Sequence, residues 1–259
     1  MNKKCILLVL ILIGLAQTAW SQEQLQMTIQ GLELTFIKVP KGTFWMGADS
    51  NDVFTQKDEY PARIVTISKD FYFGQTEVTQ ELWEQVMHYN PSTFRHPQNP
   101  VEMISWNDCQ YFIDVLNNLW EGEGQFRFPS EAEWEYACRM GELDYKDEQG
   151  SIVPWKLRKY AWFNSRSEGK SHPVASKAPD QMGFYDLKGS LWEWCQDWRG
   201  KYTPGPQTDP SGPPNGTRKI YRGGSWFNEP EALRAENRHG HEPDQVFTNA
   251  GLRLVYVLE

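Results

Sequence analysis

Alternating apolar and polar positions predict several short strands in the first third of the chain. Residues 32–39 place Leu32, Leu34 and Phe36 on one face, and the chain then turns at Pro40 into a second apolar stretch over residues 42–47. The same alternation, bounded by turn residues, is typical of half-buried strands. Two further β segments are predicted at residues 64–67 and 71–73.

A period near 3.6 residues replaces this alternation in the middle of the chain and predicts three helices. The first is expected to begin after Thr79 as N-cap and to end at Asn90-Pro91. The second and third open with capping boxes, Ser105 with Asp108 and Ser130 with Glu133, in which each side chain satisfies a free backbone N–H. The apolar positions of the second helix are Cys109, Phe112, Ile113, Leu116 and Trp120.

From residue 141 onward the chain is rich in turns. Five prolines forbid regular structure over residues 199–218. A loop of this length in a compact domain is often functional, as a rim or a lid, and the alternative is a surface insertion. The sequence leaves both interpretations open.

The N-terminus predicts export. Lys3 and Lys4 precede an apolar run over residues 5–16, and small residues precede a cleavage site after Ser21. This pattern is a secretory signal peptide, so residues 1–21 are expected to be removed and residues 22–259 to form one domain in the periplasm or outside the cell. Cys5 lies before the apolar run rather than after it, which argues against a lipid anchor. No segment of the mature chain is long and apolar enough to suggest a membrane span.

The composition of the chain bears on which partners it can bind and on what kind of core it has. The formal net charge of −8 becomes −10 once Lys3 and Lys4 are removed, and an acidic domain argues against nucleic acid as a partner. Twelve tryptophans predict an aromatic, loop-rich core, in which irregular backbone needs many side-chain partners.

The sequence contains few groups suited to covalent chemistry. Three cysteines remain after the signal peptide, an odd number that leaves a free thiol or an intermolecular bridge. Cys109 and Cys138 are expected to be buried on helices, and Cys195 to pack behind Trp-Glu-Trp. Gly223-Gly224-Ser225 is more typical of a turn with a hydroxyl than of a catalytic serine, because no histidine is placed to activate it.

One histidine pair has the spacing of metal ligands. His239 and His241 would point to one side of a strand, and Glu236 or Glu242 could complete a site. The intervening Gly240 and the Glu-Pro that follows favour a polar loop instead.

A better ion candidate lies in residues 183–194. Asp186 and Glu193 flank a turn that must bend at Gly189 and expose carbonyl oxygens, and such an oxygen cage suits Ca²⁺. Lys188 would have to point away. In the alternative, Asp186 caps the turn and Glu193 pairs with an arginine.

Taken in order, the motifs of this chain resemble those of the formylglycine-generating enzyme family, also called the sulfatase-modifying factor domain. The resemblance spans about residues 33–256. The matching segments are Gly42-Thr-Phe-Trp-Met-Gly47, Glu59-Tyr-Pro61, Thr76-Glu-Val-Thr79, Pro100-Val-Glu102, Ile104-Ser-Trp106, Arg127-Phe-Pro-Ser-Glu-Ala-Glu-Trp-Glu-Tyr-Ala137, Tyr160-Ala161, His172-Pro-Val174, residues 183–194, Arg222-Gly-Gly-Ser-Trp226 and Gly251-Leu-Arg-Leu254.

The resemblance implies an α+β fold: a single compact domain with low regular secondary structure, related to C-type lectins. It also implies a structural calcium ion, held by side chains and carbonyls that fall here on Asp186, Gly189, Leu191 and Glu193. Asp186 stands where the family often has asparagine. A second calcium site of the family maps poorly onto residues 161–164 and is left open.

The resemblance does not extend to the family's catalytic thiols. The enzymes convert a sulfatase cysteine to formylglycine with oxygen and a copper ion, which two thiolates hold three and eight residues beyond the Ser of Gly-Gly-Ser. Counted from Ser225, these positions are Asn228 and Leu233, and no cysteine follows Cys195. Neither residue offers the soft ligand that Cu(I) prefers. The sequence therefore argues against copper binding and against formylglycine formation.

Two hypotheses for function follow. The first is a non-catalytic exported binding or scaffold module, with an unidentified protein or peptide partner bound where the enzymes hold substrate. The second is a divergent metal-dependent oxidoreductase that uses His239 and His241. The residues expected to line this pocket are Trp192, Ser225, Arg234, Arg238, His239 and His241.

Overall fold

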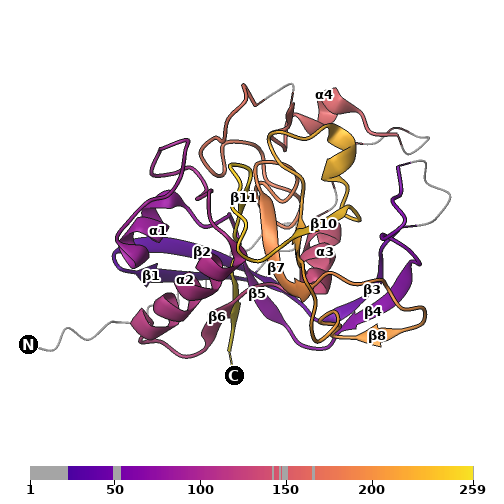
Figure 1. Cartoon of the computed structure of the whole chain (residues 1–259), viewed down its shortest axis with the longest axis horizontal. Helices are drawn as coiled ribbons and strands as arrows, with labels where there is room; N and C mark the ends of the chain where they lie inside the picture. Colours follow the sequence, from indigo (N-terminus) through magenta and orange to yellow (C-terminus); the bar gives the residue numbers. More distant parts are fainter. Residues whose placement is uncertain are drawn as a thin grey trace, which may run out of the picture.

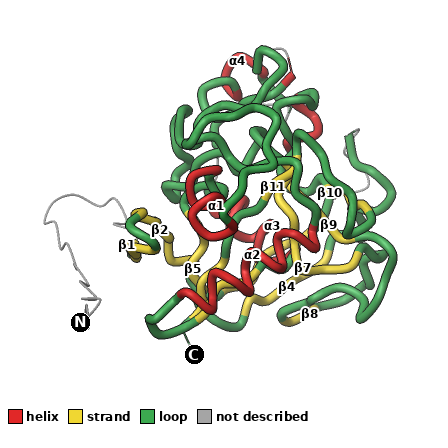
Figure 2. Tube along the Cα trace, turned by 60° about the vertical axis from the view of Figure 1, so that its left-hand side comes forward, coloured by secondary structure: helices red, strands yellow, loops and turns green. Residues whose placement is uncertain are grey.

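A computed structural model describes residues 23–48, 54–141, 143–145, 147, 151–164 and 167–258. The signal peptide prediction falls on residues outside this set. Short strands and helices are joined by long loops, which dominate the trace in Figure 2. The elements, in order (Figure 1), are β1 Gln24–Ile29, β2 Leu32–Val39, β3 Gly42–Met46, β4 Arg63–Ile67, β5 Phe71–Gly74, α1 Gln80–Met87, α2 Trp106–Leu119, β6 Gln125–Arg127, α3 Glu131–Met140, α4 Pro154–Leu157, β7 Trp192–Trp198, β8 Gln207–Thr208, β9 Lys219–Arg222, the 3-10 helix η2 Pro230–Leu233, β10 Arg238–His241, β11 Ala250–Gly251 and β12 Val255–Val257.

The largest sheet joins the two ends of the described chain. Its strand order is β1-β2-β5-β12-β6, and the C-terminal strand β12 pairs antiparallel with both β5 and β6. This sheet carries the predicted strands of residues 32–39 and 71–73. Strand β1 was not predicted from the sequence; it pairs along its whole length with β2. A strand from the C-terminus therefore lies inside the sheet that the N-terminal strands begin, between β5 and β6.

Helices α1 and α2 pack together over an aromatic core. Trp83 and Phe112 stack with ring centroids 4.8 Å apart and planes 6° apart. The predicted caps are present: the Thr79 side chain accepts a hydrogen bond from the Leu82 N–H, and Ser105 forms a complete capping box with Asp108. Helix α1 ends earlier than expected, because His88 adopts a left-handed conformation at its C-cap.

Helix α3 connects the other two sheets. Ser130 and Glu133 form the predicted capping box at its start. One face of α3 contacts β3 and β4, which form a small sheet with β8 at the end of the molecule opposite β1 and β2 (Figure 1). Another contacts β7 and β9, which lie in the sheet of order β10-β9-β7-β11. This position makes α3 the centre from which buried ion pairs reach neighbouring strands.

Two expectations for local structure are wrong. His239 and His241 lie on strand β10, not in a loop, because β10 pairs antiparallel with β9 over Arg238 to His241. The proline-rich segment of residues 199–218 is not wholly irregular, since β8 pairs parallel with β4. Both strands are stabilised by partners distant in sequence.

The burial of the cysteines matches a further expectation. Cys109, Cys138 and Cys195 are free thiols and buried. No helix among the described residues is long and apolar enough to cross a membrane.

Candidate functional site

The turn over residues 183–191 depends on left-handed backbone conformations. Gly183, Asp186, Gly189 and Ser190 all have positive φ values. Glycine is required at position 189, because a Cβ atom there would lie 2.2 Å from the Trp162 carbonyl oxygen. The sharp bend that the sequence predicted at Gly189 is present.

One buried carboxylate, Asp186, lies in this turn, and a second, Glu77, packs against it. Asp186 accepts a hydrogen bond from the Ala175 N–H at 2.8 Å through Oδ2, while its buried Oδ1 has no hydrogen-bond partner among the described residues. Glu77 accepts from the Leu191 N–H at 3.0 Å and from the Ser190 hydroxyl at 3.2 Å. Burial raises the pKa of Asp186 to about 6. Burial, and then the charge of Asp186, raises the pKa of Glu77 well above its usual range.

The third carboxylate, Glu193, is paired with an arginine, as the alternative interpretation of the sequence had it. Arg253 Nη2 lies 2.6 Å from Glu193 Oε1, and Arg253 Nε lies 3.0 Å from both carboxylate oxygens. The Trp134 indole N–H donates to Oε2 at 2.6 Å. Glu193 is fully buried, so these donors supply the partners that its charge requires.

Some of the oxygen atoms at this turn are available to a hard cation and others are already occupied. Asp186 has a buried oxygen without a partner, and Glu77 is a second carboxylate that the sequence analysis did not single out. The oxygens of Glu193, by contrast, already accept from Arg253 and Trp134. Lys188 points elsewhere: its Nζ lies 3.4 Å from the Cys138 sulfur and from the Leu233 carbonyl oxygen. Among the described residues, no group of three or more His, Cys, Asp or Glu side chains could hold a metal ion. A calcium ion here would therefore rely on backbone carbonyls together with Asp186.

The Gly-Gly-Ser segment leads from β9 into a tightly connected turn. Gly223 and Gly224 have φ values of 101° and 73°. The Ser225 hydroxyl donates to Asn228 Oδ1 at 2.6 Å and accepts from Asn249 Nδ2 at 3.1 Å. Ser225 is thus bonded within the turn, as its sequence context suggested.

Leu233, at the second position where the enzymes have cysteine, is part of a small hydrophobic core. It is 1% exposed and packs in a cluster with Tyr145, Leu157, Ala161 and Phe163. An aliphatic side chain buried in this way stabilises the fold through apolar contacts and offers no metal ligand.

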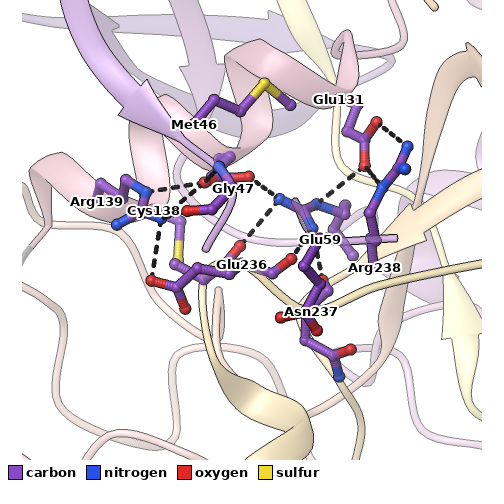
Figure 3. A network of polar contacts seen from close by, with 12 residues as sticks. Met46, Gly47, Glu59, Glu131, Cys138, Arg139, Glu236, Asn237 and Arg238 are labelled. Carbon is purple, nitrogen blue, oxygen red and sulfur yellow. Dashed lines mark hydrogen bonds and ion pairs between the residues drawn. The ribbon is translucent and has the colours of Figure 1, made fainter. Parts of the chain in front are cut away.

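Arg234 and Arg238, which were expected to line the pocket, are buried in ion pairs. Arg234 forms two hydrogen bonds to Glu59, at 2.7 and 2.8 Å, and Arg238 forms two to Glu131, at 2.6 and 2.7 Å. Figure 3 shows the second pair within a larger network that also contains Arg139, which bonds to Glu236. Fully buried Arg222 contacts Glu135 in the same region.

His239 and His241 lie with aromatic side chains on the sheet that contains β7, β9 and β10. The Tyr221 ring has its centroid 5.8 Å from each imidazole, with nearly parallel planes. Trp192 contacts His239, and Phe247 contacts His241. His241 Nδ1 is also 2.7 Å from Gln245 Oε1. The structure therefore brings Trp192, His239 and His241 together around Tyr221, apart from the ion pairs of Arg234 and Arg238. We call these five residues, Trp192, Tyr221, His239, His241 and Phe247, the aromatic–histidine cluster.

Comparison with known proteins decides the family. The model of the sulfatase-modifying factor enzyme 1-like domain matches residues 22–258. The chain belongs to this family. The match confirms the resemblance drawn from the sequence motifs.

Relatives of this sulfatase-modifying factor domain protein carry different names. It is 29% identical over 248 residues to the chaperone protein LppX of Paenibacillus barcinonensis, covering 78% of this chain and 85% of the relative. It is 32% identical over 172 residues to the formylglycine-generating enzyme of Streptomyces coelicolor, covering 61% of this chain and 52% of that enzyme.

A solved structure confirms the fold class. The Treponema denticola variable protein 1 superposes with a TM-score of 0.78 at 27% sequence identity, covering 90% of this chain and 98% of the other. The chain is thus a single α+β domain with low regular secondary structure, of the formylglycine-generating-enzyme and C-type-lectin-like type, as expected.

Proposed function

We propose that this sulfatase-modifying factor domain protein is a non-catalytic binding or scaffold module. The observation that carries the proposal is the replacement of both thiolate positions by residues with structural contacts. Asn228 is hydrogen-bonded to Ser225, and Leu233 is buried in an apolar cluster. A Cu(I) ion would find no thiolate at either position.

Recognition of a protein or peptide partner would use the aromatic–histidine cluster. The contacts to a partner would come from the exposed His239 and the half-buried His241 and Phe247, which offer hydrogen bonds and apolar area. His239 is exposed at the edge of this group, while Trp192 and Tyr221 lie buried beneath it. The naming of one relative as a chaperone protein, and of a structural neighbour as a variable protein, is compatible with a binding role.

Calcium is the ion that we propose for the turn at residues 186–193. The support is the unpartnered oxygen of Asp186 together with the excess of negative charge, since three buried carboxylates, Glu77, Asp186 and Glu193, lie at this turn and Arg253 bonds to Glu193. The ion would bind Asp186 and the carbonyls of Gly189 and Leu191, with Glu193 shared with Arg253.

Export is the location that we propose, on the basis of residues 1–21. Intact-mass measurement of the protein purified from the periplasm or the medium tests this directly. A chain that begins at Gln22 is expected, and a chain that retains Lys3 and Lys4 would contradict the proposal.

A divergent oxidoreductase is the second candidate. It is favoured by the position of His239 and His241 two residues apart on β10, which places both rings on one side of the strand. The contacts of both imidazoles with the Tyr221 ring weigh against a shared metal ion, because chelation would require the rings to turn out of these contacts.

Metal analysis and an activity assay separate the two candidates. The protein is purified without added metal, its iron, copper and calcium are measured, and it is incubated with a cysteine-containing sulfatase peptide, copper and oxygen. The Streptomyces coelicolor enzyme serves as the positive control. The module predicts calcium alone and unmodified peptide; stoichiometric iron or copper, or formylglycine in the product, would overturn it.

A further inference from the structure

A cavity lies under the proline-rich segment, at the end of the molecule that contains β3, β4 and β8. Its volume is about 410 Å³. The rim is exposed and includes Lys201, Thr203 and Ser211, whereas the floor is buried and includes Arg63 and Tyr202. The sequence allowed two interpretations of residues 199–218, a functional rim or lid and a surface insertion. In the structure this segment forms one wall of a cavity that reaches the core.

Arg63, on strand β4, differs from the other buried arginines. Four of the five buried arginines described lie in ion pairs: Arg222 with Glu135, Arg234 with Glu59, Arg238 with Glu131 and Arg253 with Glu193. Arg63 has no carboxylate within ion-pair distance in the described part of the chain.

The surroundings of Arg63 give it little compensation. The residue is only 8% exposed. Its Nη2 lies 3.8 Å from the Met46 sulfur, a weak acceptor, and its guanidinium carbon lies 4.0 Å from the centroid of the Tyr202 ring. Its buried Nε has no hydrogen-bond partner among the described residues. Burial lowers the pKa of Arg63, the direction expected for a cation removed from water. A buried charge of this kind is costly unless it gains a partner.

The carboxylates that line the same cavity already have their own partners. Glu131 bonds to Arg238 through both oxygens. Asp209 accepts from the backbone N–H and the hydroxyl of Ser68. Asp197 accepts from the Glu131 N–H at 2.8 Å, and burial raises its pKa to about 7, so that at neutral pH it is partly protonated. Among the described residues, these contacts leave Arg63 without an ion-pair partner.

We propose that this cavity binds the carboxylate group of a small ligand, with Arg63 as the group that recognises it. A planar carboxylate matches the fork of a guanidinium in two parallel hydrogen bonds. The single negative charge of a carboxylate compensates the buried Arg63 guanidinium, whereas a phosphate dianion would be repelled more strongly by Glu131 and Asp209. Trp198, Pro210 and Pro213 supply apolar walls for the rest of the ligand, and the volume is in the range of small-molecule sites.

The site is independent of the proposed calcium turn and of the aromatic–histidine cluster. None of the residues of those two sites lines the cavity at Arg63. Failure of calcium binding or of partner binding at those two sites would therefore not imply failure of carboxylate binding at Arg63.

The test uses a matched pair of probes that differ in charge. Whole protein labelled with ¹⁵N-arginine is titrated with N-acetylalanine, which has a free carboxylate, and with neutral N-acetylalaninamide at equal ionic strength. The Arg63 Nε–Hε signal is assigned by its absence in Arg63→Lys. We expect a saturable shift of this signal with the acid and none with the amide. Acetate and inorganic phosphate are titrated in parallel.

Variants separate recognition from folding. Arg63→Lys keeps the charge but loses the fork, and should weaken binding of N-acetylalanine by about tenfold or more, the loss expected for a charge-assisted hydrogen bond. Because this variant lacks the Arg63 Nε–Hε signal, its affinity and that of the other variants are measured by isothermal titration calorimetry. Ser211→Trp, at the exposed rim, should block the cavity while leaving the floor intact, so it serves even if the arginine variant fails to fold. Arg127→Lys, at a pair with Glu133 elsewhere, should bind as the wild type does.

Four results would overturn the proposal. One is no saturable binding of either acid to the wild type up to tens of millimolar. The second is equal binding of acid and amide. The third is unchanged binding in both Arg63→Lys and Ser211→Trp. The fourth is tighter binding of phosphate than of acetate, because that would reject the carboxylate as the recognised group.

Discussion

Arg253 and Glu193 form a buried ion pair that ties the C-terminal segment to strand β7. The shortest contact joins Arg253 Nη2 to Glu193 Oε1 at 2.6 Å, and neither side chain is more than 1% exposed. Arg253 also donates to the carbonyl oxygens of Gly74 and Tyr185, at 3.1 and 2.9 Å. One side chain therefore connects β7, β5 and the turn at residues 183–191.

Removal of Arg253 should destabilise the protein strongly. Arg253→Leu leaves Glu193 buried without its counter-charge, and we expect a loss of about 3–5 kcal/mol in the free energy of unfolding, measured by urea denaturation. Lys170→Ala, which breaks the exposed pair with Glu168, is the control and should cost less than about 1 kcal/mol. The double variant Arg253→Leu with Glu193→Leu should be less destabilised than Arg253→Leu alone, because no buried charge is left unpaired. Equal losses in Arg253→Leu and Lys170→Ala would contradict this account.

Gly189→Ala should be more destabilising than the same change at an open glycine. At residue 189 an added Cβ meets the Trp162 carbonyl oxygen, and φ is +86°. Gly205 has a φ of +91° and no atom within 4 Å of the added Cβ. Gly205→Ala therefore measures only the cost of a left-handed backbone conformation for alanine, about 1–2 kcal/mol. Thermal melting of both variants measures the difference. If Gly205→Ala lowered the melting temperature as much as Gly189→Ala, the close approach of Trp162 would have no energetic role.

Asp180 should make the protein less stable as the pH rises from 4 to 7. Burial raises the pKa of Asp180 to about 7, from a usual value near 3.8. Between these values the folded state binds more protons than the unfolded state, so the free energy of unfolding falls as pH increases. Asp180→Asn removes this titration and keeps an oxygen that can accept from the Met182 and Phe184 N–H groups.

The variant is therefore expected to gain stability relative to the wild type as the pH rises from 5 to 8. Urea denaturation at each pH measures the gain. Asp144→Asn, which removes a surface carboxylate of the same charge, is the control for net charge. A constant difference between Asp180→Asn and the wild type across this pH range would show that the Asp180 carboxyl does not titrate as stated.

Local signals made the helices and several strands predictable. Ser105 and Ser130 each lie three residues before their capping partner, and this short spacing is visible in the sequence alone. The alternation over residues 32–39 likewise predicted β2 with its bounds. These features depend on neighbours within one turn or one strand.

Long-range pairing explains what the sequence did not reveal. Arg238 and Glu131 are 107 positions apart, and Arg234 and Glu59 are 175 apart, so nothing local distinguished these arginines from pocket residues. Glu77 stands out in the sequence only as part of a family motif, although it contacts the turn at Ser190 and Leu191. Strand β10 was missed for the same reason, because its partner β9 lies across an intervening loop.

Removal of calcium should lower the melting temperature if Asp186 anchors the ion. A ligand that binds only the folded state stabilises it by about 2.7 kcal/mol at a hundredfold excess over its dissociation constant, which corresponds to about 5–10 °C for a domain of this size. The protein is first shown to contain calcium by metal analysis, then melted with and without a chelator.

Asp186→Asn keeps a side-chain oxygen and should remain sensitive to the chelator, whereas Asp186→Leu should not. This contrast separates the ion from the fold, because both variants remove the buried negative charge of Asp186 but only one removes the ligand atom. An unchanged melting curve for calcium-loaded wild type in chelator would rule out a stabilising ion at this turn. The proposal requires that the chelator lower the melting temperature of the wild type and of Asp186→Asn and leave that of Asp186→Leu unchanged.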